Sequence, residues 1–203
     1  ITSCHSTHSR PIKRLSPFVE AGTYMNLDDL PAGHMTLMGC NPQTLGPCVW
    51  SEAQQRSVFT LYAMTRSPIM FSGDMPTDDA TLKIVTNREV LAIQERSVGN
   101  RQLSNVAKCS SSNESYACSE VIWVADCSDD PQHGKYVAFF WTGAGNTTIV
   151  LPLGKLGGIF TGGRQSVIAR DLWRNEDLPR VTGGSLVADL GSHDVLLLRV
   201  SPG

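Results

Sequence analysis

The spacing of hydrophobic and polar residues changes character about halfway along the chain. In the first half, residues 51–95 follow a helical pattern that begins with "SEAQQRSVFTLYAMTRS", where apolar side chains recur at intervals of three and four. Ser51 and Gln54 form the S-x-x-Q arrangement of a capping box, which predicts that the helix starts at this serine. Pro68 disfavours helical geometry in the residue before it, so the helix is expected to end just ahead of it.

Beyond this helix the apolar pattern is interrupted once and then resumes. The run "IMFS", residues 69–72, is short, apolar and bounded by Pro68 and Gly73, which is typical of a strand buried on both faces of a parallel sheet. The segments "TDDATLKIVT" and "NREVLAIQE" each carry an Asx or Thr start signal and predict two further short helices. Helix, buried strand, loop and helix in this order indicate an α/β fold for the first half.

After Gly99 the chain is a succession of short β-type runs. These runs are "EVIWVAD", "KYVAFFWT", "NTTIVLPL", "SVIARDLW", "SLVADL" and "DVLLLRVS". Turn-forming segments such as "SDDPQHGK", "GAG" and "TGG" separate them, which predicts an antiparallel sandwich. The boundary is expected near residues 97–103, with an α/β region over 1–97 and an antiparallel β-sandwich over 98–203. We expect "CSSSNESYAC", residues 109–118, to be an exposed loop.

Length and composition fit a globular protein with one large domain or two small ones. The 203 residues are 41% hydrophobic, which is enough to build a core. The net charge of -2 argues against nucleic acid or an anionic membrane surface as the main partner. No apolar run approaches the roughly 18 residues that a membrane-spanning helix needs, so no membrane span is expected.

An even number of cysteines favours disulfide bonds, and the six are Cys4, Cys40, Cys48, Cys109, Cys118 and Cys127. None has the C-x-x-C spacing of a structural zinc site, so no metal is expected, and 15 pairings stay open. Asn113 and Asn146 begin glycosylation sequons. Together these features favour a secreted or lysosomal (vesicular) location. The chain starts at Ile1 without an initiator methionine, so we expect a processed or truncated product.

Several segments, taken in order, carry a family resemblance. The first half contains "YMNLDDLPAG", "SEAQQRSVFTLYAMTRSPIMFSGDM" and "TLKIVTNREVLAIQERSVGNRQ", and the second half contains "ARDLWRNEDLP" and "GSHDVLLLRVSPG". The first set resembles the last part of the catalytic barrel of melibiase-type α-galactosidases, and the second set resembles the β-sandwich that follows it. Residues 24–203 are thus similar to members of glycoside hydrolase family 27.

This resemblance implies a fold and an activity. The fold is the last βα units of a (β/α)8 barrel followed by a C-terminal antiparallel β-sandwich. The activity is removal of terminal α-linked galactose with retention of configuration. Retaining hydrolysis uses two carboxyl groups about 5 Å apart, one as nucleophile and one as acid/base. The resemblance implies no metal and no other cofactor.

The same resemblance implies that this chain holds no catalytic residue. The family places both catalytic aspartates ahead of the motif that "YMNLDDL" resembles, and residues 1–23 contain no aspartate. Tyr24 stands where the family has Trp, Asn26 stands where it has the first Asp, and Asp28 stands where it has the second. Asp29 replaces a Met. We therefore expect "YMNLDDL" to be scaffold at the rim of a sugar site.

The candidates for that substrate-binding rim are Tyr24, Asn26, Asp28 and Asp74. Asp28, at a predicted strand end, either positions a catalytic group or sugar hydroxyl or closes a local turn. Asp29 faces the other side of an extended segment and is expected to be solvated. Asp74 follows "IMFS", where barrel loops carry function, and the alternative is an Asx turn.

A partial barrel requires a partner. Residues 1–97 supply two or three βα units, whereas a closed barrel has eight and takes about 250 residues. We expect an N-terminal chain of the same protein, separated by proteolysis, to cover the strand edges and to carry both catalytic aspartates. A homo-oligomer of this two-chain unit stays open. The alternative, favoured by the rim departures, is a non-catalytic glycan-binding or interaction protein derived from the hydrolase.

Overall fold

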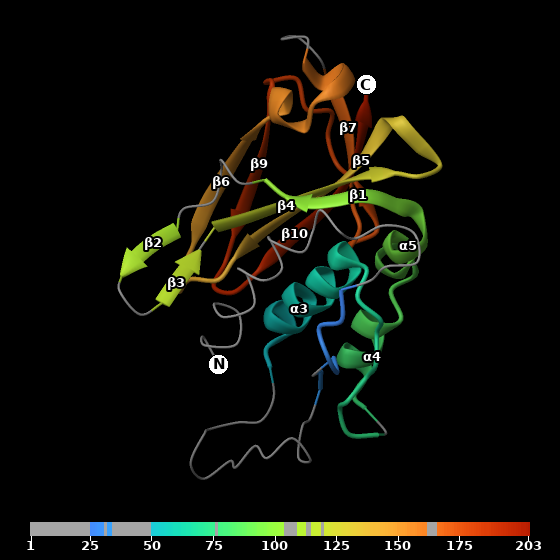
Figure 1. Cartoon of the computed structure of the whole chain (residues 1–203), viewed down its shortest axis with the longest axis vertical. Helices are drawn as coiled ribbons and strands as arrows, with labels where there is room; N and C mark the ends of the chain where they lie inside the picture. The colour runs from blue at the N-terminus through green and yellow to red at the C-terminus, as the bar shows by residue number, and fades with distance from the viewer. Residues whose placement is uncertain are drawn as a thin grey trace.

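The computed structural model describes residues 25–30, 32–33, 50–75, 77–103, 109–112, 115–118, 120–161 and 166–203. Within these ranges three α-helices precede a region of antiparallel strands (Figure 1). None of the helices described is long and apolar enough to cross a membrane.

The helices begin at the residues that the sequence marks. Helix α3 spans Glu52–Thr65, and the reciprocal bonds between Ser51 and Gln54 confirm the predicted capping box. The helix ends at Arg66, which adopts a left-handed conformation (φ 55°) two residues before the proline. Helices α4 (Asp79–Val85) and α5 (Arg88–Arg96) are capped by the side chains of Asp78 and Asn87. All three predicted helices are therefore confirmed.

The prediction of a strand buried on both faces at residues 69–72 is wrong for this structure. Phe71 makes only a single isolated bridge, with Leu30, among the described residues. This bridge is parallel, which agrees with the α/β fold predicted for the first half. The side chain of Met70 is 44% exposed, and Ile69 and Phe71 are half-buried. The physical reason is that, within the described residues, Leu30 is the one bridge partner of this run, so the run is not part of an extended sheet and Met70 stays exposed.

Ten strands make three antiparallel sheets in the described chain. The strands are β1 (Ser97–Gln102), β2 (Cys109–Ser112), β3 (Ser115–Cys118), β4 (Glu120–Cys127), β5 (Asp130–Trp141), β6 (Thr147–Pro152), β7 (Val167–Asp171), β8 (Glu176–Asp177), β9 (Ser185–Leu190) and β10 (Val195–Pro202). The main sheet has the order β1-β4-β5-β10-β7-β8, and β6-β9 and β2-β3 form two-stranded sheets. Two short 3-10 turns, Leu153–Leu156 and Gly158–Thr161, follow β6.

The six β-type runs named from the sequence are all strands, but two further features differ from expectation. Residues 109–112 and 115–118 pair as strands β2 and β3, so the prediction of a loop without regular structure there is wrong. Strand β1 was not predicted, because "SVGNRQ" lacks a regular alternation of apolar and polar residues. Its pairing with β4 supplies the order that its own sequence does not specify.

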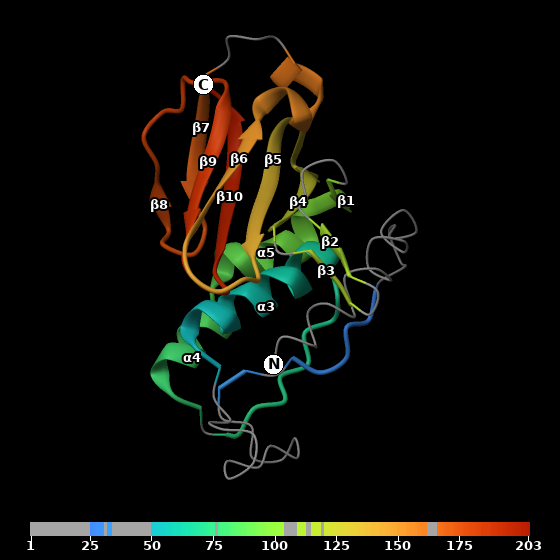
Figure 2. The same cartoon turned by 90° about the vertical axis from the view of Figure 1, so that its left-hand side faces the viewer.

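The main sheet is covered on both faces, which explains its continuous apolar runs. Along β4, Ile122 and Val124 belong to a core shared with β6 and β9, whereas Trp123 and Ala125 belong to a core shared with the helices. The alternation follows from the two-residue period of a strand. Figure 2 shows β6 and β9 on one side of this sheet and helices α3 and α5 packed beneath it.

Specific polar bonds fix the helices to the sheet. The indole Nε1 of Trp173 donates to Thr60 Oγ1 at 2.9 Å. The Asn87 amide, which also caps α5, donates from Nδ2 to the carbonyl of Leu172 at 2.9 Å. Arg170 on β7 forms a two-pronged ion pair with Glu89 at 2.7 and 2.8 Å. The helices therefore have one defined position on the sandwich.

Candidate functional site

The polar stretch singled out from the sequence forms a segment held against the end of α3, and we call residues 25–30 the rim segment. Its far end is fixed beside residues 70–72. The Leu30 amide donates to the Met70 carbonyl at 2.7 Å, and the Ser72 amide donates to the Leu30 carbonyl at 3.1 Å. Nearer its start, the Leu27 amide donates to Ser67 Oγ at 2.9 Å. Both ends of the rim segment are thus attached to the loop that follows α3.

Tyr62 on α3 holds the middle of the rim segment through its hydroxyl group. Its side chain is buried (4% exposed), and its hydroxyl lies 2.7 Å from the carbonyl oxygen of Leu27 and 2.8 Å from that of Asp29. A third contact, to the carbonyl of Asp28, is 3.3 Å long. Burial, and then the nearby carboxylates of Asp28 and Asp29, raise the pKa of Tyr62 to about 12. The hydroxyl therefore stays protonated and available as a donor at physiological pH.

Asp28 adopts an unusual backbone conformation at the exposed crest of the segment. Its φ is 72°, in the left-handed region that Asp and Asn enter more readily than most residues. Asn26 stabilises this conformation because its Oδ1 accepts the Asp28 amide proton at 2.8 Å. A carboxylate oxygen could accept the same bond, so Asn in place of the family's Asp preserves the local turn. The side chains of Asn26 and Asp28 are both exposed.

The buried side-chain amide of Gln55 holds the chain just beyond the rim segment. Gln55 accepts the Gly33 amide proton and the Thr81 hydroxyl proton on Oε1, each at 3.1 Å, and donates from Nε2 to the Trp50 carbonyl. Gly33 has a φ of +68°, and a Cβ there would come within 2.8 Å of Thr77 Oγ1. This position therefore requires glycine.

Asp74 lies in a loop that touches the chain just after the rim segment. A Cβ on the neighbouring Gly73 would come within 2.0 Å of the Ala32 carbonyl oxygen, so the two backbones are in close contact. The Asp74 side chain is half-buried. The loop of Asp74 therefore lies against Ala32, just beyond the rim segment that contains Asp28, and the roles predicted for both aspartates stay predictions. Tyr24 lies outside the described residues.

Sequence reasoning missed the residues that hold the rim segment. Tyr62 and Gln55 lie on the predicted helix, where a pattern indicates a buried face but not the bonds that a buried hydroxyl or amide makes. Ser67 precedes a proline and carries no recognisable signal. These residues are recognised by the burial of their polar side chains next to backbone with a positive φ. This feature can be seen only in a three-dimensional structure.

The cysteines and sequons are described in part. Cys127 is a free, buried thiol, so the prediction that it forms a disulfide is wrong for this structure. Burial in the core raises the pKa of this thiol. Cys109 and Cys118 are described by their backbone within the β2-β3 hairpin. Asn146 is exposed at the start of β6. Cys4, Cys40, Cys48 and Asn113 lie outside the described residues.

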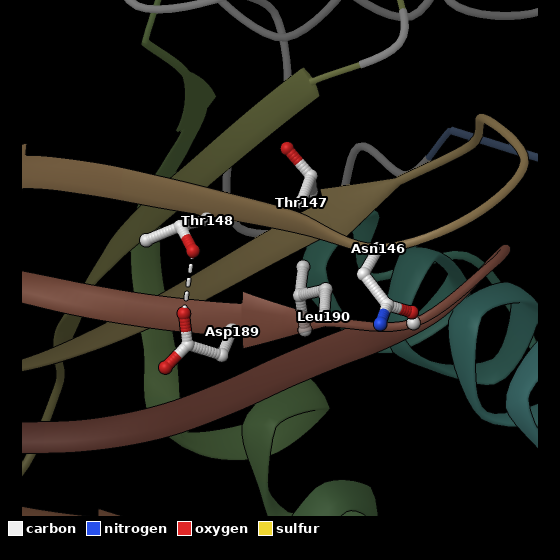
Figure 3. Close-up of a pocket in the computed structure, with 6 residues that line it drawn as sticks. Asn146, Thr147, Thr148, Asp189 and Leu190 are labelled. Carbon is white, nitrogen blue, oxygen red and sulfur yellow. Dashed lines mark hydrogen bonds between the residues drawn. The ribbon is translucent and has the colours of Figure 1, made fainter.

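Two pockets lie away from the rim segment. One, of about 470 Å³, lies at the end of β6 and β9, where Thr148 Oγ1 donates to Asp189 Oδ1 at 2.6 Å beside Asn146 and Leu190 (Figure 3). The other, of about 840 Å³, lies between the helices and Trp173. Neither is lined by a rim residue. The described part of the chain contains no group of three or more His, Cys, Asp or Glu side chains arranged to hold a metal ion.

Comparison with known proteins agrees with this architecture. Residues 120–200 match the family described as the alpha galactosidase C-terminal beta sandwich domain. A GH27 β-L-arabinopyranosidase from Geobacillus stearothermophilus has a similar structure, with a TM-score of 0.80 and 26% identity over 100% of this chain and 42% of that one. The chain resembles the C-terminal portion of a melibiase-type α-galactosidase.

Two plant proteins are similar to this α-galactosidase-like chain in sequence. Alpha-galactosidase 3 of Arabidopsis thaliana is 25% identical over 150 residues, which are 73% of this chain and 32% of that protein. An alpha-galactosidase of Cyamopsis tetragonoloba is also 25% identical over 150 residues, which are 33% of its length. The α-galactosidase-like chain thus spans about a third of the length of the curated relatives it matches.

Proposed function

We propose that this chain is the C-terminal part of a retaining glycoside hydrolase that removes terminal α-D-galactosyl or β-L-arabinopyranosyl residues. The support is the match of residues 120–200 to the α-galactosidase sandwich family, together with the activities by which the similar proteins are named. The two sugars form one substrate class, because the β-L-arabinopyranosyl ring has the stereochemistry of the α-D-galactosyl ring without its hydroxymethyl group. A site for one ring is therefore a natural site for the other.

The observation that carries this proposal is the construction of the rim segment. An exposed carboxylate, that of Asp28, is held in a left-handed conformation by Asn26, and Tyr62 bonds the carbonyls on either side of it. A strained, well-supported polar residue of this kind is typical of functional sites. We assign Asp28 the positioning of a sugar hydroxyl or of a catalytic group, and Asp74 a place on the same rim.

The proposal places the catalytic aspartates on an N-terminal portion of the same protein that completes a (β/α)8 barrel. The parallel bridge between Leu30 and Phe71, and the helices that follow it, support the reading of residues 1–97 as barrel units. The 44% exposure of Met70 next to this bridge fits a surface that the rest of the barrel would cover. A secreted or lysosomal location belongs to the same proposal.

A hydrolysis assay on the full-length protein tests the proposal. The substrates are the 4-nitrophenyl α-D-galactoside and β-L-arabinopyranoside, with the β-D-galactoside as a matched control of the opposite anomeric configuration. We expect turnover of one or both of the first two and none of the third. Saturable binding of galactose without turnover would favour a non-catalytic glycan-binding protein, and turnover of the β-D-galactoside would contradict the assigned substrate class.

A further inference from the structure

Two cysteines are opposite each other in the backbone register of a hairpin that is separate from the other two sheets. Strands β2 and β3 pair with each other and with no other described strand, and Figures 1 and 2 show them side by side. The register places Cys109 opposite Cys118, with three further pairs between them and the two-residue connection. The backbone therefore brings together two of the six cysteines whose pairing the sequence leaves open.

The hairpin geometry is suitable for a disulfide bond. Residues directly opposite each other in antiparallel strands have Cα atoms about 4.5 or 5.5 Å apart, and a disulfide takes Cα separations of about 4.4–6.8 Å. Both separations lie within the disulfide range, so the register of Cys109 opposite Cys118 is suitable for a disulfide in either kind of pair.

The sequence of β2 contains no large apolar residue that could bury the hairpin. An isolated two-stranded hairpin is at best marginally stable in water, and three of the four residues of β2 are serines. Cys127, the next cysteine along the chain, is buried in the core as a free thiol. A covalent bond across the open end of the hairpin is the stabilising element that the sequence supplies.

We propose that Cys109 and Cys118 form a disulfide that links β2 to β3. The oxidant is a low-molecular-weight disulfide such as glutathione disulfide. One cysteine thiolate attacks it, which gives a mixed disulfide and one glutathione thiolate. The second cysteine thiolate then attacks the protein sulfur of that mixed disulfide and releases the other glutathione. Two glutathione thiols thus take up the two protons and two electrons that the cysteine thiols lose. The bond belongs to an oxidising compartment and is independent of any catalytic activity.

Peptide mapping of the full-length protein tests the pairing. The protein is purified from a secretory host without reductant, alkylated with iodoacetamide, freed of N-glycans and cut after glutamate. Cleavage after Glu114 and Glu120 separates Cys109, Cys118 and Cys127 into three peptides. We expect residues 96–114 and 115–120 to appear as one linked species that separates on reduction. Alkylated Cys109 and Cys118, or a link from either to another peptide, would overturn the proposal.

Single variants give a second readout. In Cys109→Ser, we expect Cys118 to lose its protection and to be alkylated in at least nine molecules of ten. The control Ser111→Ala, in the same strand, should leave the linked species unchanged. Continued protection of Cys118 in Cys109→Ser would mean that it pairs elsewhere and would also overturn the proposal.

Discussion

Replacing Tyr62 with phenylalanine tests whether one hydroxyl organises the rim segment. The substitution leaves the buried ring in place and removes the donor that contacts the carbonyls of Leu27 and Asp29 at 2.7 and 2.8 Å. A hydroxyl has one proton, so these contacts share a single hydrogen bond at any moment. Losing that bond and leaving the carbonyls without a donor costs roughly 1–3 kcal/mol.

Amide hydrogen exchange measures this loss where it occurs. The amides of Leu27 and Leu30 are protected by bonds to Ser67 Oγ and to the Met70 carbonyl, so they report on opening of the rim segment. The free energy above corresponds to exchange that is roughly 5 to 150 times faster in Tyr62→Phe. The full-length protein is compared with its variant at one pH and temperature by mass spectrometry.

A second buried tyrosine provides the matched control. Tyr136 on β5 is 3% exposed, its pKa is also raised to about 12, chiefly by burial, and its hydroxyl is paired with the thiol of Cys127 instead of the rim segment. Tyr136→Phe should leave exchange at Leu27 and Leu30 unchanged. Exchange at Leu27 and Leu30 within twofold of the wild type in Tyr62→Phe, or equal acceleration in both variants, would show that the Tyr62 hydroxyl does not hold the rim segment.

The remaining predictions concern Asp28, Tyr62 and Asn87. In the full-length protein, Asp28→Asn should lower kcat/KM for the proposed hydrolysis roughly 10- to 100-fold, because a charge-assisted bond is lost. The neighbouring Asp29→Asn should stay within twofold of the wild type, and equal effects of the two substitutions would contradict the assignment. Because the folded-state pKa of Tyr62 is raised, its contribution to stability is complete below about pH 10 and is lost toward pH 12. The phenolate absorbance of Tyr62, taken as the difference between wild type and Tyr62→Phe, should therefore titrate near 12. A midpoint near 10 would contradict this prediction. Asn87→Ala should reduce the free energy of unfolding by roughly 1.5–3 kcal/mol, because it removes both the cap of α5 and the bond to Leu172. Asn87→Asp keeps the cap and should therefore reduce the free energy of unfolding by less. Equal midpoints of urea unfolding for the two variants would contradict this prediction.

Local signals in the sequence were sufficient for most of the elements. The capping box at Ser51, the Asx caps at Asp78 and Asn87 and the six apolar runs each act through neighbouring residues, and each forms the expected helix or strand. The failures are elements that depend on a partner. Strand β1 is ordered by β4, the hairpin at 109–118 is ordered by pairing within itself, and residues 69–72 lack a second neighbour in the described chain.

The residues assigned to the candidate site stay predictions, and the residues that support them in the structure were not predicted. The resemblance marked Asp28 and Asn26 as rim positions, but nothing in the sequence indicates that Asn26 caps Asp28 or that Asp28 has a φ of 72°. Tyr62 lies more than thirty residues along the chain from the carbonyls it contacts. Contacts of this range depend on how α3 packs against the rim segment, and packing is a property of the whole fold.

The most direct test of the central claim is the configuration of the sugar first released by the full-length protein. Proton NMR of the anomeric signals during hydrolysis of 4-nitrophenyl α-D-galactoside distinguishes the two stereochemical outcomes before mutarotation mixes them. For a retaining hydrolase, we expect α-galactose to appear first and the β anomer to grow in later. Initial release of β-galactose, or no release from this substrate and from the β-L-arabinopyranoside, would contradict it.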